Sequence, residues 1–365
     1  MRMSLTGREW TATEAAPLAE RQERLRDILR ACGSVCVGYS GGVDSVFLAA
    51  MAVGTLGREN VLAVTGRSAA YPMVQRDVAL ECARAFAIPH LEIATAELAD
   101  VRYVANPSNR CYYCKSELWP KLNVVARERG LRAVVDGSNA DDAGDYRPGF
   151  AAAREHGVRS PLLEAGLTKA DVRALSARMG LPTWDQPAAP CLSSRLPYGI
   201  AVTPARLRAV ERAEEALRLL GFRELRVRHH DDCLRVEFAP AELERAFALA
   251  RDIHARITAP ADVRVLLDVE GYRRGALNEV LVQIGAGETT SQSADRGPGD
   301  EHRSHAAQGA VPVHESAGFH RDIAVVAGAN HELARSAAAG LRARGFRYIA
   351  LDTAAFAAMA TGEAS

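Results

Sequence analysis

The stretch SVCVGYSGGVDSVFLAAMAVGTLG, residues 34–57, decides the fold. Its first six residues are a short apolar run rich in β-forming side chains, which ends at the small residues Ser40, Gly41 and Gly42. From Val43 onward the apolar residues follow a helical pattern. The stretch therefore predicts a strand, a tight loop and a helix in direct succession.

The neighbouring sequence repeats this alternation. Further strands are predicted at 61–68, 90–95 and 131–139, with helices at 73–88 and from residue 110. Pro120 is expected to kink or delay the second of these helices. Strands that alternate with helices form a parallel sheet covered on both faces. We therefore predict an α/β, parallel-sheet domain over residues 21–200, after a flexible N-terminus at 1–20.

After about residue 200 the pattern changes to a smaller α+β domain. Helices are predicted at 203–221 and 240–257, and strands at 223–230, 233–239 and 262–271. This domain is expected to span 201–284. Residues 285–318 are rich in Gly, Ser, His and acids and predict a flexible linker. Residues 319–365 predict a small βαβ-like extension of unknown role, too small for its own core and therefore docked on another surface.

Composition excludes several classes of protein. The 365 residues are 48% hydrophobic, enough for a large core, and Lys plus Arg equals Asp plus Glu at 45 each. No global field therefore attracts nucleic acid or an anionic membrane. There is no signal-peptide pattern and no run of ~18 apolar residues. Seven cysteines without a secretion signal favour thiol chemistry over a disulfide framework, so we expect a cytoplasmic protein.

The loop SGGVDS, residues 40–45, has the features of a phosphate cradle. Its glycines let backbone N–H groups approach an anion, Ser40 and Ser45 add hydroxyls, and a helix N-terminus follows. It lacks the lysine of a Walker A loop. It resembles the PP-loop of enzymes that split ATP into AMP and pyrophosphate; the alternative is an ordinary strand-to-helix turn. The resemblance implies nucleotide binding by Ser40, Gly41, Gly42, Val43, Asp44 and Ser45, with Asp44 organising the nucleotide and its Mg²⁺.

A second polar loop, DGSNADDAGDYRPG at 136–149, follows a predicted strand, where ligands of open α/β sheets collect. Acids can hold magnesium and arginine can clamp a phosphate or carboxylate. The alternative is a solvated capping loop. We assign Gly137 and Asn139 here, and Ser68 after an earlier strand, to nucleotide binding. The acids of the loop are Asp141, Asp142 and Asp145; we assign Asp142, Asp145 and Arg147 to the substrate.

Three cysteines stand apart from the rest. Cys191 lies between prolines in QPAAPCLSSRLPYG, residues 186–199, a loop that positions it rigidly and favours a reactive or ligating thiol. Ser194 and Arg195 follow it and are candidates for binding the nucleotide. Cys111 and Cys114 open a predicted helix in RCYYCKSELW, residues 110–119. The other four lie within apolar patterns and are expected to be buried structural thiols: Cys32, Cys36, Cys82 and Cys233.

The predicted hairpin at 223–239 carries a cationic face. Strand alternation places Arg226, Arg228 and His230 on one side of the first strand, and Arg235 and Glu237 alternate with apolar residues on the second. The alternative is a solvated antiparallel face. A metal site at the adjacent pairs His229–His230 and Asp231–Asp232 is disfavoured because neighbouring strand residues point to opposite faces.

Together these motifs resemble a known family. SGGVDS, RCYYCK, GSNADDAGDYRPG, PCLSSRLPYG and LDVEGYRRGALNEVL, in this order over residues 20–282, are similar to the LarE family of ATP-dependent sulfur transferases in nickel-pincer cofactor biosynthesis. The resemblance implies an adenine nucleotide alpha hydrolase-like PP-loop domain. It also implies adenylation of pyridinium-3,5-biscarboxylic acid mononucleotide and conversion of its carboxylates to thiocarboxylates, for a product that serves lactate racemase and related enzymes.

The same resemblance implies the parts of the site. Asp44 and Cys191 would be catalytic, ATP and Mg²⁺ the cofactors, and the protein a homo-oligomer without membrane partners. Arg226, Arg228 and Glu237 would border the substrate pocket at a subunit interface. Two functions from other classes stay open: a transfer-RNA thiolase, which the neutral charge disfavours, and a nucleotide sensor without turnover.

Two hypotheses account for the source of the sulfur. Cys111, Cys114 and Cys191 suit three irons of a 4Fe-4S cluster whose fourth iron takes hydrosulfide from sulfide or a sulfur donor. The alternative is sacrificial transfer of the sulfur of Cys191, with the other two thiols structural. A zinc site usually needs four protein ligands, and the sequence offers no fourth at convincing spacing.

Overall fold

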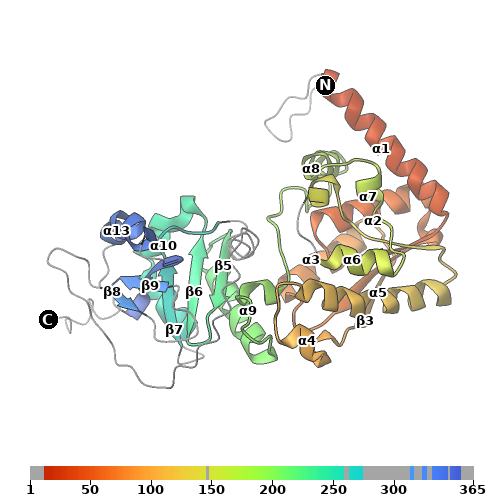
Figure 1. Ribbon diagram of the computed structural model, residues 1–365. Helices are drawn as coiled ribbons and strands as arrows, with labels where there is room; N and C mark the ends of the chain where they lie inside the picture. The colour runs from red at the N-terminus through yellow and green to blue at the C-terminus, as the bar shows by residue number, and fades with distance from the viewer. Residues whose placement is uncertain are drawn as a thin grey trace. The chain divides into compact units, whose positions relative to one another are not determined.

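The structure is a computed structural model that describes residues 12–144, 148–258, 263–273, 313–315, 323–326, 331–343 and 346–354. The chain divides into two compact units, Met1–Cys191 and Leu192–Ser365, called here the N-terminal and C-terminal units. Figure 1 shows the helices and strands of both. Among the described helices, none is long and apolar enough to cross a membrane.

The N-terminal unit is built on a parallel sheet. Its strands are β1 (Val35–Gly38), β2 (Val61–Arg67), β3 (His90–Ala94) and β4 (Ala133–Val135), in the order β3-β2-β1-β4. Each neighbouring pair is parallel, as the alternation of strands and helices predicts. Its helices are α1 (Ala12–Cys32), α2 (Val43–Leu56), α3 (Met73–Ala85), α4 (Val101–Val104), α5 (Arg110–Glu128), α6 (Pro148–Glu155), α7 (Pro161–Glu164) and α8 (Lys169–Arg178).

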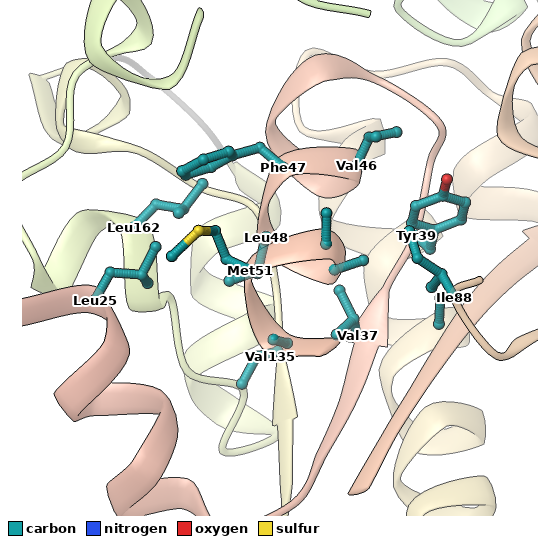
Figure 2. Close-up of a cluster of buried hydrophobic side chains, with 14 of the residues drawn as sticks. Leu25, Val37, Tyr39, Val46, Phe47, Leu48, Met51, Ile88, Val135 and Leu162 are labelled. Atoms are coloured by element: carbon teal, nitrogen blue, oxygen red, sulfur yellow. The ribbon is translucent and has the colours of Figure 1, made fainter. Parts of the chain in front are cut away.

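The core lies on both faces of this sheet. Val35 and Val37 of β1 pack into one hydrophobic cluster, and Cys36 between them packs into another with Trp119 of α5. This is the period-two alternation of a strand covered on both sides. Figure 2 shows the first cluster, where Phe47 and Met51 of α2 lie toward Leu162 and Leu25, and Val37 belongs to the strand beside this helix. The helix that follows the SGGVDS loop is therefore anchored by its own apolar residues.

The strand order creates a switch point at β1. The chain runs from β1 to β2 and β3 on one side and then returns to β4 on the other. The loops after β1 and β4 therefore leave the same edge of the sheet in opposite directions, which opens the crevice where ligands of such sheets bind.

The C-terminal unit holds a mixed sheet, which confirms the predicted second α+β region. Its strands are β5 (Leu225–His229), β6 (Cys233–Phe238), β7 (Arg264–Asp268), β8 (Val313–Glu315), β9 (Ile323–Val326) and β10 (Tyr348–Asp352), in the order β5-β6-β7-β10-β9-β8. Its helices include α9 (Pro204–Leu219), α10 (Leu243–Ala248), α11 (Ala250–Thr258) and α13 (His331–Ala343). β10, which lies in the extension predicted at 319–365, pairs with β7 in antiparallel fashion. The extension therefore docks as part of this sheet.

Several boundaries differ from those expected. α1 begins at Ala12, inside the segment 1–20 expected to be flexible, because its helical pattern continues toward the N-terminus. β8 lies inside the linker predicted at 285–318, since its backbone pairs with β9. Pro120 lies within α5 and does not delay its start. The helix predicted at 240–257 is divided into α10 and α11 around Leu249.

Candidate functional site

The SGGVDS loop joins β1 to α2 in a conformation that requires glycine. Gly41 has φ 72°, and a Cβ there would lie 2.7 Å from the Cβ of Ala79 on α3. The hydroxyl of Ser45 accepts a hydrogen bond from the Ser40 backbone N–H at 3.1 Å and donates to the Gly42 carbonyl at 3.1 Å. The loop is thus closed by its own residues above the start of α2, where helix N–H groups suit an anion.

Asp44 connects this loop to two others. Its carboxylate accepts hydrogen bonds from Lys169 Nζ at 2.5 Å and from Asn139 Nδ2 at 3.3 Å. A Cβ on Gly137 would lie 3.0 Å from the Ser45 nitrogen, so the loop after β4 packs directly on the first turn of α2. The structure therefore brings the predicted residues Asp44, Ser45, Gly137 and Asn139 together at the switch point.

Lys169 is a residue that sequence reasoning missed. It begins α8 after the capping residue Thr168, so it reads in the sequence as an ordinary exposed helix residue. Its signal is weak because 125 residues separate it from Asp44. A lysine ammonium beside a phosphate loop is a point charge suited to a phosphoryl oxygen.

Asp141 and Asp142, two of the predicted acids in the loop after β4, hold the conformation of that loop through hydrogen bonds. Asp142 is buried and accepts a hydrogen bond from the Asn139 N–H at 3.0 Å, and Asp141 accepts from the Lys169 N–H at 2.9 Å. These bonds hold Asn139 and Lys169 where they meet Asp44. Asp145 and Arg147, assigned above to the substrate, lie outside the described residues.

The turn after β2 also reaches the loop. Ser68 accepts a hydrogen bond from the Ala70 N–H at 3.1 Å, and Tyr71 donates its hydroxyl to the Ser40 carbonyl at 3.1 Å. Burial raises the pKa of Tyr71 above its usual value, so the phenol stays a neutral donor. The predicted residue Ser68 thus belongs to the turn that supports Ser40.

The segment before Cys191 is tied to the same region of the N-terminal unit. Arg173 of α8 donates to the carbonyls of Trp184 at 2.6 Å and Gln186 at 2.7 Å. Gln186 donates to Gln75 of α3 at 3.4 Å, the helix against which Gly41 packs. Cys191 itself is exposed. Two helices next to the SGGVDS loop therefore anchor the segment that presents this thiol.

Cys111 and Cys114 lie one turn apart at the start of α5, the first exposed and the second partly so. Burial raises the pKa of Cys114 to about 12, with Lys115 opposing and with Cys191 and Cys111 adding to the rise. The three predicted thiols thus share one neighbourhood. Within the residues that the structure describes, no group of three His, Cys, Asp or Glu side chains could hold a metal ion.

The cysteines left out as structural are buried, as expected: Cys32, Cys36, Cys82 and Cys233. Burial raises the pKa of each of them. Cys32 also accepts a hydrogen bond from Arg159. These thiols are unsuited to nucleophilic chemistry.

The charged face of the hairpin is buried and paired in the C-terminal unit. The register places Arg226 opposite Glu237 and Arg228 opposite Arg235, all on one face. Arg228 donates to both oxygens of Glu237 at 3.0 to 3.2 Å, and Arg235 pairs with Glu237 at 2.7 Å. The alternative interpretation, that this face of the hairpin is exposed to solvent, is wrong because every residue of β5 and β6 is buried.

The turn that follows Cys191, η4 (Leu192–Arg195), belongs to this charged region. Arg195 pairs with Glu214 of α9 at 2.9 Å, with both side chains 2% exposed, and Arg228 donates to the Ser194 carbonyl at 2.8 Å. The guanidinium of Arg195 holds α9, and its binding of the nucleotide stays a prediction. A cavity of about 550 Å³ lies elsewhere in this unit, beside Arg206 and Arg256, and includes no residue predicted for catalysis, nucleotide or substrate.

The sequence of this chain is similar to those of several known proteins. A family model described as NAD synthase matches residues 18–138. An uncharacterised protein of Synechocystis is 41% identical over 73% of this chain and 100% of its own length. The pyridinium-3,5-bisthiocarboxylic acid mononucleotide synthase of Lactiplantibacillus plantarum, a LarE protein, is 35% identical over 73% of this chain and 97% of its own length. The chain belongs to the LarE family.

As a LarE protein, this chain is longer than those relatives, since they match 73% of it over nearly their whole length. The last LarE motif ends at residue 281, and β8, β9, α13 and β10 follow it. Among solved structures, NMN synthetase from Francisella tularensis is 19% identical over 50% of this chain and 76% of its own, with a TM-score of 0.39.

Proposed function

We propose that this protein is an ATP-dependent sulfurtransferase of nickel-pincer cofactor biosynthesis, acting on pyridinium-3,5-biscarboxylic acid mononucleotide. The observation that carries this proposal is membership of the LarE family, together with the convergence of Asp44, Asn139, Gly137 and Lys169 on the SGGVDS loop. The relative from Lactiplantibacillus plantarum is named as the synthase of the corresponding bisthiocarboxylic acid.

The chemistry explains why ATP is needed. A carboxylate is a poor electrophile with a poor leaving group. In the first step a carboxylate oxygen attacks the α-phosphorus of ATP, the bond to the β-phosphate breaks, and pyrophosphate leaves. In the second step a sulfur nucleophile attacks the acyl carbon, and AMP leaves with the carboxylate oxygen. The product carries sulfur in place of that oxygen.

The N-terminal unit supplies groups for the first step. The loop N–H groups and the start of α2 suit the departing pyrophosphate, and Lys169 suits a phosphoryl oxygen. Asp44 is partly exposed, and its carboxylate is the kind of hard oxygen ligand that Mg²⁺ prefers. In this role Asp44 would hold the ion and Lys169 would contact the phosphate.

The C-terminal unit supplies groups for an anionic substrate. Arg226 lies over the ring of Tyr272 at 5.0 Å, and burial together with the positive charge of Arg195 lowers its pKa. A guanidinium in such surroundings gains from an anionic partner. Arg226, Arg228 and Glu237, which accepts hydrogen bonds from Arg228, are therefore the residues that we assign to the substrate phosphate and carboxylates, in a homo-oligomer.

Sulfur would enter at Cys191. The thiols of Cys111, Cys114 and Cys191 share one neighbourhood. Cysteine thiolates are the usual ligands of iron–sulfur clusters, and the ligands of a cluster lie farther apart than those of a single metal ion. Cys111, Cys114 and Cys191 would hold a 4Fe-4S cluster, which supplies a hydrosulfide on its open iron when bound. The competing route is attack by Cys191 itself on the acyl carbon, with loss of AMP. A base then removes the Cα proton of Cys191, the Cβ–Sγ bond breaks, and the thiocarboxylate leaves with the sulfur, so that dehydroalanine remains.

The first test measures adenylation. With ATP and the pyridinium dicarboxylate mononucleotide, the protein should release pyrophosphate and AMP. Asp44→Asn and Lys169→Met should lower this rate about a hundredfold, because each removes a charge from the phosphate site. Lys121→Met is the matched control, since Lys121 pairs with Glu117 on the surface of α5. A wild-type protein that releases no pyrophosphate, or an Asp44→Asn variant at full rate, contradicts the proposal.

The second test separates the two sources of sulfur. The protein is reconstituted anaerobically with iron and sulfide, and products per chain are counted beside the intact-protein mass. Several products per chain with unchanged mass support the cluster. At most one sulfur transferred per chain, with hydrogen sulfide lost from Cys191, supports sacrificial transfer and refutes the cluster.

A further inference from the structure

Arg235 of β6 is a buried cation whose partners come from β7, from β10 and from the turn between β5 and β6. Its side chain is 1% exposed, it donates Nη1 to Asp268 of β7, and it donates Nε to His230 at 3.2 Å. The face of its guanidinium lies 3.6 Å from the ring centroid of Tyr348 on β10. A buried cation is strongly destabilising unless it is paired and covered. Asp268 and Tyr348 therefore hold Arg235 in its position.

Arg235 also contacts Glu237, which is assigned above to the substrate and which in turn binds Arg228. Its Nη2 lies 2.7 Å from Glu237 Oε1, and Glu237 accepts hydrogen bonds from Arg228 Nε and Nη2 at 3.0 to 3.2 Å. Although burial opposes it, Arg235 and then Arg228 hold the pKa of Glu237 below its usual value. The order of contacts is Tyr348, Arg235, Glu237 and Arg228.

Tyr348 belongs to the extension beyond the last LarE motif. β10 pairs with β7, with Ala350 opposite Asp268 and Leu351 opposite Leu267. Tyr348 is 3% exposed, so its ring is enclosed where it covers Arg235.

Helix α13 fastens the extension to α10 and to the residues after β7. Arg335 pairs with Glu244 at 2.5 Å, Arg342 pairs with Glu270, and the ring of His331 stacks on Phe247 at 4.6 Å. The extension is therefore held in one position on the sheet.

We propose that the C-terminal extension is a positioning element for the substrate site: Tyr348 holds Arg235, Arg235 orients Glu237, and Glu237 orients Arg228. This inference rests on the proposed function, since it takes Arg228 and Glu237 as substrate residues. Tyr348 acts on Glu237 and Arg228 through Arg235, whose guanidinium lies over its ring.

Removing the aromatic ring should loosen the chain of contacts from its far end. Without the ring, the guanidinium of Arg235 loses the electrostatic attraction of the ring face, and its geometry toward Glu237 relaxes. The hydrogen bonds that Arg228 donates to the two oxygens of Glu237 then become weaker. The substrate loses a preorganised arginine, whereas the nucleotide loop in the N-terminal unit is unchanged.

The test compares three variants of the full chain. Tyr348→Leu removes the ring, Tyr348→Phe keeps it, and Ile349→Ala creates a cavity from the next residue of β10, which points to the opposite face. We expect Tyr348→Leu to raise the KM for the pyridinium dicarboxylate mononucleotide roughly threefold to thirtyfold, the range of one desolvated cation–π contact. Its kcat and its ATP affinity should change little, and Tyr348→Phe should behave as wild type.

Two results would overturn the inference. One is an unchanged KM in Tyr348→Leu at a temperature where that variant is folded. The other is an equal rise of KM in Ile349→Ala, because general loosening of the strand would then explain the effect.

A readout without substrate separates this inference from the proposed function. With ¹⁵N-labelled arginine, the Nε–H signals of Arg228 and Arg235 should be protected from exchange in wild type and in Tyr348→Phe, and should lose protection in Tyr348→Leu. Protection retained in Tyr348→Leu refutes the coupling whatever the substrate is. Failure of the wild type to turn over the dicarboxylate refutes the proposed function, and with it the substrate role of the extension, but leaves the coupling of Tyr348 to Arg228 standing.

Discussion

The carboxylate of Asp44 lies between Lys169 of α8 and Asn139 of the loop after β4. These two neighbours lie 95 and 125 residues from Asp44 in the chain, so one side chain connects the SGGVDS loop, the loop after β4 and the start of α8. Asp44 was predicted from its place in SGGVDS alone. Its partner Lys169 carries no local signal, because a lysine at a helix start is most often solvated.

At the same scale the cysteines differ in predicted reactivity. Burial raises the pKa of Cys114 to about 12, so at pH 8 its thiol is almost wholly protonated. Iodoacetamide should therefore modify the exposed residues Cys111 and Cys191 well before Cys114, with the four buried cysteines last. Peptide mapping after timed alkylation measures the order. Early modification of Cys114 in the metal-free protein would contradict the structure around it.

At the scale of elements, α9 is joined to β5 through one buried carboxylate. Glu214 accepts hydrogen bonds from Arg195 at 2.9 and 3.1 Å, from Arg218 at 2.8 Å and from the Val227 N–H of β5 at 3.3 Å. A helix and a strand edge that share an anion keep a fixed spacing. Because Arg195 follows Cys191 by four residues, this pairing also fixes the chain after the thiol.

This pairing predicts a pH dependence. Burial opposes ionisation, but Arg195 and then Arg218 hold the pKa of Glu214 below its usual 4.5. Since the folded pKa is lower than the unfolded one, the stabilisation is present above about pH 5 and is lost as the pH falls through the folded pKa. Glu214→Gln should cost about 3 kcal/mol at pH 7, because it leaves Arg195 without a buried counter-charge, and should flatten the loss of stability in acid.

Urea unfolding of the C-terminal unit at a series of pH values checks this expectation. Glu215→Gln is the matched control, since Glu215 is the next residue and is exposed. An acid profile in Glu214→Gln that parallels wild type would show that another group governs the titration.

At the scale of the whole molecule, the chain carries a LarE part and an extension that completes the second sheet. In the described residues, β7 pairs with β6 on one side and with β10 on the other. The extension therefore covers what would be an open sheet edge, and an open edge invites pairing with other chains.

Deletion of residues 285–365 should destabilise the C-terminal unit selectively. Tyr348, Ile349 and Leu351 are at most 3% exposed, and each buried side chain of this size contributes about 1.5 to 3 kcal/mol. Scanning calorimetry should show a lowered transition for the C-terminal unit with little change for the N-terminal unit, and light scattering should show association through β7. A deletion variant with an unchanged melting profile would show that the extension adds no stability.

Local pattern determined much of this protein from the sequence alone. The alternation around residues 34–57 predicts the parallel sheet, and the series of motifs that includes PCLSSRLPYG and LDVEGYRRGALNEVL predicts the family. Both are read from local properties, namely strand and helix periods and short loops. Only the tertiary structure decided which distant groups meet. Lys169 reaches Asp44, Arg195 turns to Glu214, and Tyr348 covers Arg235 because buried charges must find partners wherever the packed chain brings them, and no spacing along the chain encodes that choice.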